Sequence, residues 1–450
     1  MCLLLMKTQQ KPPVAFFWFR RDLRLHDNAG LYHALKIGLP VQCVFIFDRN
    51  ILDQLEDKND RRVSFIHYHL RKINQQLKNY GSRLITVYDT PENAWSTLIG
   101  QYNIKAVFTN HDYEPYAIKR DTSIDKFLNA RGIAFHTFKD QVIFEKNEVA
   151  KDDGSPYTVF TPYWKKYLQL LDESKYKAYS SEKLLKNLNP EEWEEIIPLE
   201  KMGFKKSDGE IDPVLPSVSL LSNYGERREF PSKGGTSRMS VHLRFGTVSI
   251  RQLVSLAVNK SDRYMNELIW REFYMMILWN FPHVVHSAFK KEFDAIKWRN
   301  DESEFEKWCN GTTGYPMVDA GMRELNATGY MHNRVRMITA GFLTKHLLID
   351  WRWGEAYFAS KLLDFELASN NGGWQWSAGC GVDAAPYFRI FNPYEQQKRF
   401  DPDFKYIRKW IPEYETPEYP EPMVEHRFAR QRCLETFGIT LKKSRQLSLL

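Results

Sequence analysis

The chain has 450 residues and a formal net charge of +7, with 43% hydrophobic and 26% charged residues. This length predicts two domains, and the ordinary hydrophobic content argues against intrinsic disorder. The modest basic excess permits a polyanionic partner without requiring one, because clustering of charge on one face decides that question. The 13 Trp residues favour stacking on flat ligands or bases, with a large aromatic core as the alternative.

The cysteines and the hydropathy pattern indicate the compartment. Five cysteines, odd in number and widely scattered, predict neither a disulfide framework nor a metal site. No stretch approaches 18 apolar residues, and residues 1–10 lack the features of a signal peptide. We therefore expect a cytoplasmic protein in a reducing compartment, with no membrane partner.

Short apolar runs in the first third of the chain predict a sheet. They occur at residues 14–19, 41–47, 84–87, 106–109 and 134–138, with helix-like segments between them. This alternation predicts a doubly wound, Rossmann-like α/β domain with a parallel sheet over residues 12–140. The G-x-G-x-x-G fingerprint of dinucleotide binding does not follow the first run.

The rest of the chain is predicted to be helical after a linker. Residues 141–222 are polar and rich in Lys, Glu, Ser and Pro, as expected of an interdomain linker. Residues 223–436 show long segments with a 3.6-residue period, which predict an all-α domain. Residues 437–450 are expected to form a short basic tail.

A small-residue segment opens the helical region. Gly235-Thr-Ser-Arg-Met-Ser240 follows Tyr224 and Arg228, and its hydroxyls and backbone N–H groups suit an anion nest. A plain helix cap rich in Ser and Thr is the alternative.

The next segment places four functional groups on one helix face. Glu267, Trp270, Arg271 and Tyr274 have the spacing i, i+3, i+4 and i+7. A carboxylate, an indole, a guanidinium and a phenol on one stripe favour ligand binding. The alternative is a half-exposed face with an intrahelical Glu267–Arg271 ion pair.

Asn333 and Met337 form another pair, four residues apart on a helix predicted over residues 333–348. A carboxamide and a thioether offer a ligand one hydrogen-bonding group and one polarizable apolar contact. Arg334 and Arg336 point away from each other on this helix. Core packing of Asn333 and Met337 is the alternative.

The run Leu367-Ala-Ser-Asn-Asn-Gly-Gly-Trp-Gln-Trp376 suits a large planar cofactor. Asn370 and Asn371 can hydrogen-bond heteroatoms of a ring. The two glycines that follow allow a close approach that a Cβ would block. A helix start with buried tryptophans is the alternative.

With Asp383-Ala-Ala-Pro-Tyr-Phe-Arg-Ile-Phe-Asn-Pro393, this run closely resembles the flavin-binding signature of the DNA photolyase and cryptochrome family. The resemblance covers nearly the whole chain and is closest to the class I cyclobutane pyrimidine dimer photolyases. It implies an α/β antenna domain and a helical domain that binds FAD, used fully reduced as FADH⁻. It also implies a deoxyribodipyrimidine photo-lyase, a carbon–carbon lyase that repairs UV-damaged DNA with light.

The resemblance assigns expected roles to individual residues. The residues expected to hold FAD are Tyr224, Thr236, Ser237, Arg238, Met239, Ser240, Arg336, Asp364, Phe365, Glu366 and Asn370. Arg336 is expected to pair with Asp364, and Glu366 stands where many members carry Asp. Electron transfer from the surface to the flavin is expected to use Trp298, Trp351 and Trp374.

The expected lesion and DNA contacts lie in the helical domain. The residues expected to act on the lesion are Glu267, Trp270, Asn333, Met337 and Trp376, with Asn333 near flavin N5 or the substrate. The residues expected to bind DNA are Arg228, Glu267, Trp270, Arg271, Tyr274, Asn333, Arg334 and Gln396. We expect a monomer whose partner is DNA containing pyrimidine dimers.

The sequence leaves four points open. A second, antenna chromophore is implied, but folate-type members carry an Asn-Glu pair where this chain has Tyr116 and Ala117. A cryptochrome-type blue-light receptor is the nearer rival, although plant-type receptors usually carry Asp near flavin N5 and a long C-terminal extension. A (6-4) photolyase needs a histidine pair, and only His332 is found near Asn333. A flavin-independent nucleic-acid-binding protein is the remaining alternative.

Overall fold

The computed structural model describes residues 11–447, with side chains described through residue 441. The expectation about a signal peptide concerns residues 1–10 and lies outside this range. The chain forms two compact units. The first comprises Met1–Ile143, Glu173–Pro213 and Phe245–Leu253, and the second comprises Phe144–Asp172, Val214–Arg244 and Val254–Leu450.

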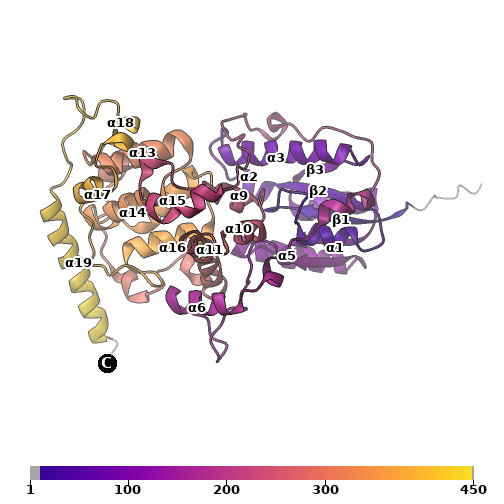
Figure 1. The fold of residues 1–450 in the computed structure, drawn as a ribbon, viewed down its shortest axis with the longest axis horizontal. Helices are drawn as coiled ribbons and strands as arrows, with labels where there is room; N and C mark the ends of the chain where they lie inside the picture. Colours follow the sequence, from indigo (N-terminus) through magenta and orange to yellow (C-terminus); the bar gives the residue numbers. More distant parts are fainter. Residues whose placement is uncertain (1–10, 448–450) are drawn as a thin grey trace, which may run out of the picture. The chain divides into compact units, whose positions relative to one another are not determined.

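The first unit is built on a five-stranded parallel sheet, as the sequence predicts (Figure 1). The strand order is β3-β2-β1-β4-β5. The strands are β1 (Pro13–Phe19), β2 (Val41–Asp48), β3 (Leu84–Asp89), β4 (Asn103–Asn110) and β5 (Ala134–Phe138). The helices are α1 (Ala29–Leu35), α2 (Arg49–Leu52), α3 (Arg61–Lys78), α4 (Pro91–Gln101), α5 (Pro115–Asn129) and the first half of α10 (Ile250–Ala257).

Side chains along β1 point alternately to the two faces of the sheet, and helices cover both faces. Phe16 and Trp18 point to one face and pack in a core with Trp95 of α4 and Ile124 of α5. Residues at odd positions of β1 point to the other face, where α1 lies so close that a Cβ at Gly30 would approach a ring atom of Phe17 to 2.9 Å. Both faces of the strand are therefore buried, which accounts for its uninterrupted apolar sequence.

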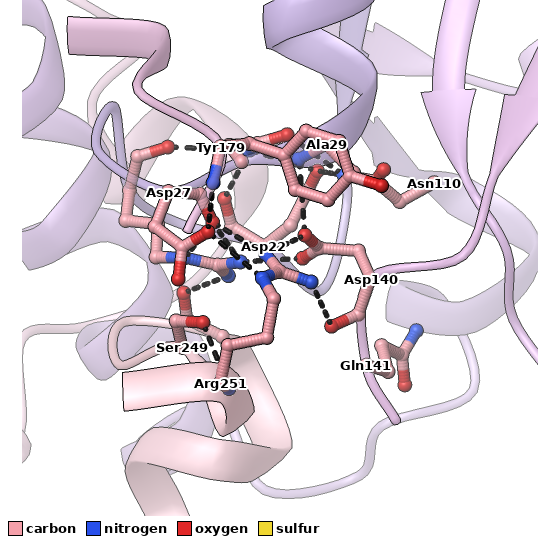
Figure 2. A network of polar contacts seen from close by, with 12 residues as sticks. Asp22, Asp27, Ala29, Asn110, Asp140, Gln141, Tyr179, Ser249 and Arg251 are labelled. Carbon is pink, nitrogen blue, oxygen red and sulfur yellow. Dashed lines mark hydrogen bonds and ion pairs between the residues drawn. The ribbon is translucent and has the colours of Figure 1, made fainter. Parts of the chain in front are cut away.

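A buried ionic network ties residues 245–253 into the first unit (Figure 2). The carboxylate of Asp140 accepts hydrogen bonds from Arg24 at 2.6 Å and from Arg251 at 2.7 Å, and Arg251 also donates to Asp27 at 2.8 Å. All four side chains are at least nine-tenths buried. Burial alone would raise the pKa of Asp140, but the two guanidinium groups outweigh it and hold that pKa below its usual range.

Helices and the loops that join them make up the second unit, which has no named strand in the part of the chain that is described, as expected for the C-terminal domain (Figure 1). Its longer helices are α6 (Phe160–Leu170), α11 (Asp262–Asn280), α12 (Glu302–Asn310), α13 (Pro316–Thr328), α14 (Asn333–Gly341), α15 (Trp351–Lys361), α16 (Leu367–Ala378), α17 (Pro393–Phe400) and α19 (His426–Leu447). Shorter ones are α7 (Val218–Ser222), α8 (Tyr224–Arg227), α9 (Ser240–Phe245) and α18 (Lys405–Trp410).

Four segments differ from the sequence-based expectation. Residues 245–253 were expected in the helical domain and belong to the first unit. The predicted linker, residues 141–222, divides between the two units and contains α6. The helix predicted at residues 333–348 ends as α14 at Gly341 and continues as a π-helical turn, Phe342–His346. Residues 437–447 of the predicted tail extend α19. None of the helices in the described chain is long and apolar enough to cross a membrane.

The ionic network generates a stability prediction. Arg251→Met removes one of the two cations beside Asp140 and leaves Asp27 without its guanidinium partner. Because breaking a buried ion pair leaves an uncompensated charge, we expect a loss of about 3–5 kcal/mol in the free energy of unfolding. Urea denaturation measures this change.

Arg49→Met is the matched control, because the Arg49–Asp53 pair in the same unit is exposed. This control should leave the urea midpoint almost unchanged. Similar midpoints for the two variants would contradict a stabilising role for the buried network.

Candidate functional site

Helix α16 is the centre of the candidate site, and it packs against α11, α14 and α15 (Figure 1). A Cβ at Gly372 would lie 2.2 Å from the Tyr274 ring of α11. A Cβ at Gly354 of α15 would lie 2.1 Å from the Trp374 ring of α16. The glycines therefore permit a close approach on two sides, which confirms the expectation for Gly372.

Because α16 is helical, its two tryptophans point about 200° apart. Trp374 is buried against Phe358 of α15, with ring centroids 4.9 Å apart. Trp376 is half-buried and lines a small cavity together with Met337 and Arg389. One indole thus faces the core of the unit, and the other lies half-buried beside Met337 and Arg389.

The amides of α16 are used in different ways. Asn371 donates to the carbonyl oxygen of Val284 at 3.0 Å, and Gln375 donates to the same oxygen at 2.9 Å. Gln375 also donates to Asn371 Oδ1. The expectation that Asn371 serves a ligand is therefore not met, because its amide anchors the helix. Asn370 donates to the carbonyl and carboxyl oxygens of Glu355, both at 3.1 Å.

Charges on α11 find partners on other segments. Glu267 forms an ion pair with Arg228. Arg271 donates to Glu366 Oε1 at 3.3 Å, and both side chains are at most 10% exposed. The alternative of an intrahelical Glu267–Arg271 pair is therefore wrong. The Arg271 guanidinium is directed at a buried carboxylate, and its assignment to the DNA backbone stays a prediction.

The two aromatic residues of α11 lie in different surroundings. The Trp270 ring stacks on Phe160 of α6 at 3.8 Å between centroids with an interplanar angle of 7°. Trp270 remains half-buried, so the helix presents a partly accessible indole. Tyr274 packs under Gly372, and burial raises its pKa. Tyr274 therefore supports α16, and its assignment as a DNA contact stays a prediction.

The predicted anion nest is a turn before α9. Arg238 has a positive φ of 53°, a conformation that turns successive backbone N–H groups to one side. Ser237 Oγ accepts a hydrogen bond from Tyr264 Oη at 3.0 Å, and Thr236 Oγ1 lies 3.4 Å from Tyr330 Oη. Met239 is buried, and Ser240 is the exposed first residue of α9.

Tyr264 is a site residue that the sequence analysis missed. It lies three residues before Glu267, on the face of α11 already singled out, so the helical spacing could have found it. Its ring packs edge-on against Tyr224 at 5.1 Å between centroids. The nest and the functional face of α11 are therefore parts of one site.

Helix α14 begins where His332 Nδ1 accepts a hydrogen bond from the Arg334 backbone N–H at 3.2 Å. Arg336 donates to both carboxylate oxygens of Asp364, at 2.8 and 3.1 Å, which confirms the expected pair. Asn333 is exposed. Its contact with flavin N5 or with the substrate stays a prediction.

The three expected electron-transfer tryptophans belong to one core. Trp351 and Trp374 are each 2% exposed, and Trp298 packs at the edge of the same cluster. Trp374 also contacts Trp308, at 6.0 Å between ring centroids, which the sequence analysis did not single out. The structure thus brings the predicted residues into one cluster, while the route of an electron stays a prediction.

Several groups in the second unit suit a large heterocyclic ligand such as FAD. Asn266 Oδ1, Trp374 Nε1 and Gln396 Oε1 are buried and have no hydrogen-bond partner in the described chain. A Cβ at Gly373 would meet nothing within 4 Å, so α16 has open space beside it. Phe365 packs on the core next to this region. The residues present fit the cofactor that the sequence resemblance implies.

Tyr116 and Ala117, which stand where folate-type members carry an Asn-Glu pair, have neither an amide nor a carboxylate in their own side chains. Tyr116 Oη donates to Asp48 at 2.5 Å, and Ala117 is buried. An antenna chromophore therefore stays a prediction, without support here for the folate type.

Comparisons with known proteins match both units. A family model described as DNA photolyase matches residues 15–181, and one described as the FAD binding domain of DNA photolyase matches residues 264–418. A deoxyribodipyrimidine photo-lyase of Halobacterium salinarum is 35% identical over 94% of this chain and 98% of that protein.

Two solved structures resemble the whole fold. A bacterial class III photolyase from Agrobacterium tumefaciens superimposes with a TM-score of 0.85, at 33% identity over 98% of this chain and 100% of that one. A cryptochrome of Synechocystis superimposes with a TM-score of 0.83, at 25% identity over 95% of this chain and 100% of that one. The similarity to a class III enzyme leaves the class I assignment a prediction.

The packing of α16 generates a second prediction. Gly372→Ala places a methyl group against the Tyr274 ring, which must then shift. Overpacking of this kind costs about 1–3 kcal/mol, and we expect a lower melting temperature and less bound flavin.

Gly373→Ala is the matched control on the same helix, because its methyl group would enter open space. In flavin-free protein it should leave stability unchanged or raise it by up to about 1 kcal/mol through helix propensity. Equal melting temperatures for the two variants would contradict the close approach of α16 and α11.

Proposed function

The chain belongs to the DNA photolyase family, and we propose that it repairs cyclobutane pyrimidine dimers in DNA with light, using FAD held by its second unit. The observation that carries the proposal is the packing of α11, α14 and α16 together inside the segment that matches the FAD-binding model. This arrangement gathers the carboxylate, indole, thioether and amide groups that the lesion and the cofactor require.

FAD, when bound and reduced, supplies an electron to the dimer in light and recovers it after the cyclobutane ring splits. The turn at residues 235–240 would hold the pyrophosphate through its backbone N–H groups, with Tyr264 fixing Ser237. The open side of α16 at Gly373 leaves room for a flat ring. Arg336 and Asp364 would close the site as a hydrogen-bonded pair.

The lesion would bind beside Met337 and Trp376, two side chains that lie close together. A dimer inside a duplex cannot reach these groups, so it must leave the stack, which costs a few kcal/mol and less at damaged bases. Trp270 would stack on the flipped dimer. Glu267 would hydrogen-bond it, since burial raises the pKa of this carboxyl group while Arg228 limits the rise.

Outside the pocket, Arg228 and Arg334 would contact backbone phosphates. Both guanidinium groups are partly exposed, at 19% and 18%. Contacts of this kind position DNA without reading its sequence, and the lesion pocket supplies the selectivity. We propose that the protein acts as a cytoplasmic monomer.

A receptor function is the second candidate, because the chain also resembles a cryptochrome. Repair is favoured by Asn333, because its carboxamide cannot protonate flavin N5 as the Asp of plant-type receptors can. A (6-4) activity is disfavoured because the sequence around Asn333 supplies a single imidazole, His332.

A repair assay tests the proposal. FAD-loaded protein is reduced chemically and illuminated with oligonucleotides that carry either one thymine dimer or one (6-4) product. We expect light-dependent reversal of the dimer alone. No reversal of the dimer by reduced, FAD-loaded protein would contradict repair and favour a receptor.

Glu267→Ala tests the lesion contact. We expect retained FAD but affinity for dimer-containing DNA lowered by about 1.5–3 kcal/mol, because a hydrogen bond involving a charged group is lost. Titration of labelled oligonucleotides in the dark measures this change, and affinity for undamaged DNA should not fall. Unchanged affinity for the dimer would remove Glu267 from the site.

Trp374→Phe tests electron supply. If Trp374 is the flavin-proximal donor, the variant should fail to photoreduce oxidised FAD yet repair dimers normally once reduced chemically. Trp353→Phe is the control, because Trp353 packs on Phe305 at the edge of the same core. Normal photoreduction in Trp374→Phe would assign the role to another residue.

A further inference from the structure

A carboxylate lies between the two arginines proposed to contact DNA phosphates. Glu229 Oε1 is 3.3 Å from Arg228 Nε, and Glu229 Oε2 accepts a hydrogen bond from Arg334 Nε at 2.7 Å and a second one from the same guanidinium. The Glu229 side chain is 32% exposed, so it lies at the surface together with both cations. One carboxylate oxygen, Glu229 Oε2, therefore occupies two Arg334 donors, Nε and Nη2, that a phosphate would use.

Both arginines have supports that do not depend on Glu229. The Arg334 guanidinium lies over the Phe400 ring, 4.3 Å from its centroid. Arg228 pairs with Glu267 and lies over the Tyr224 ring at 5.5 Å. Removal of the Glu229 charge would therefore leave both guanidinium groups near their present positions, with donors available to another anion.

We propose that Glu229 is an internal competitor for DNA phosphate, which limits how tightly the protein holds DNA of any sequence. This inference rests on the proposed function, because it assigns Arg228 and Arg334 to the phosphate backbone. A phosphate must displace the Glu229 carboxylate or stay beside it against like-charge repulsion. Since phosphate contacts carry no sequence information, Glu229 lowers affinity for damaged and undamaged DNA alike.

The opposite role would be to position the arginines for DNA. In that case loss of the carboxylate would let both side chains move and would weaken binding. The two roles predict opposite signs for one substitution, so a binding measurement separates them.

The test is Glu229→Gln, with Glu226→Gln as the matched control. Glu226 is an exposed carboxylate on α8, three residues away, and the described chain gives it no ion pair. Both variants change the net charge equally, so a general electrostatic effect appears in both. Binding of the FAD-loaded protein to undamaged and to dimer-containing duplexes is titrated in the dark from low to moderate salt.

We expect Glu229→Gln to bind both duplexes about tenfold more tightly at low salt, as for one additional released counterion. The plot of log affinity against log salt should steepen by roughly one unit, and the ratio of the two affinities should stay constant. Glu226→Gln should shift affinity much less. Glu229→Asp should bind like the unmodified protein if its shorter carboxylate still reaches Arg334.

Weaker binding by Glu229→Gln, or equal shifts in the two Gln variants, would overturn the proposal. Arg334→Gln separates this failure from failure of the proposed DNA face. If Arg334→Gln does not weaken binding, the phosphate assignment itself is wrong. If it does weaken binding, the Glu229→Gln gain should shrink in the double variant, because both changes act on one pair.

Discussion

Helix α16 can lie close to α11 and α15 because neither contact point carries a side chain. Gly372 leaves room for the Tyr274 ring, and Gly354 leaves room for the Trp374 ring. The position of α16 then fixes the rest of the candidate site. Trp374 is held in the core beside Phe358, and Trp376 reaches the cavity that Met337 also lines. Packing of this density transmits small displacements, so the proposed cofactor and lesion sites depend on the same two contacts.

Charge pairing between segments is the second feature of this unit. Arg228 pairs with Glu267, Arg271 with Glu366, Arg334 with Glu229 and Arg336 with Asp364. Each of these pairs joins residues from different segments, so they fix the segments relative to one another as well as neutralising charge.

The sheet could be predicted from the sequence, because buried parallel strands are apolar on both faces. The runs at residues 14–19 and 41–47 are continuously apolar in this way. The ion-pair partners of the charged residues on α11 could not be predicted from the sequence. Spacing along one helix predicts which residues can meet on that helix, yet Glu267 and Arg271 pair with residues 39 and 95 positions away. Long-range pairing of this kind has no local signature. The return of residues 245–253 to the first unit was missed for the same reason, since its anchor is Arg251 in the buried network.

We propose that an electron passes from the reduced flavin to the lesion and returns after the ring splits, so that repair is catalytic in flavin. The most direct measurement counts the dimers reversed per bound flavin under illumination, after chemical reduction and removal of the reductant without oxygen. We expect each flavin to reverse many dimers while the absorbance of reduced flavin stays constant. Oxidation of one flavin for each dimer reversed would contradict it.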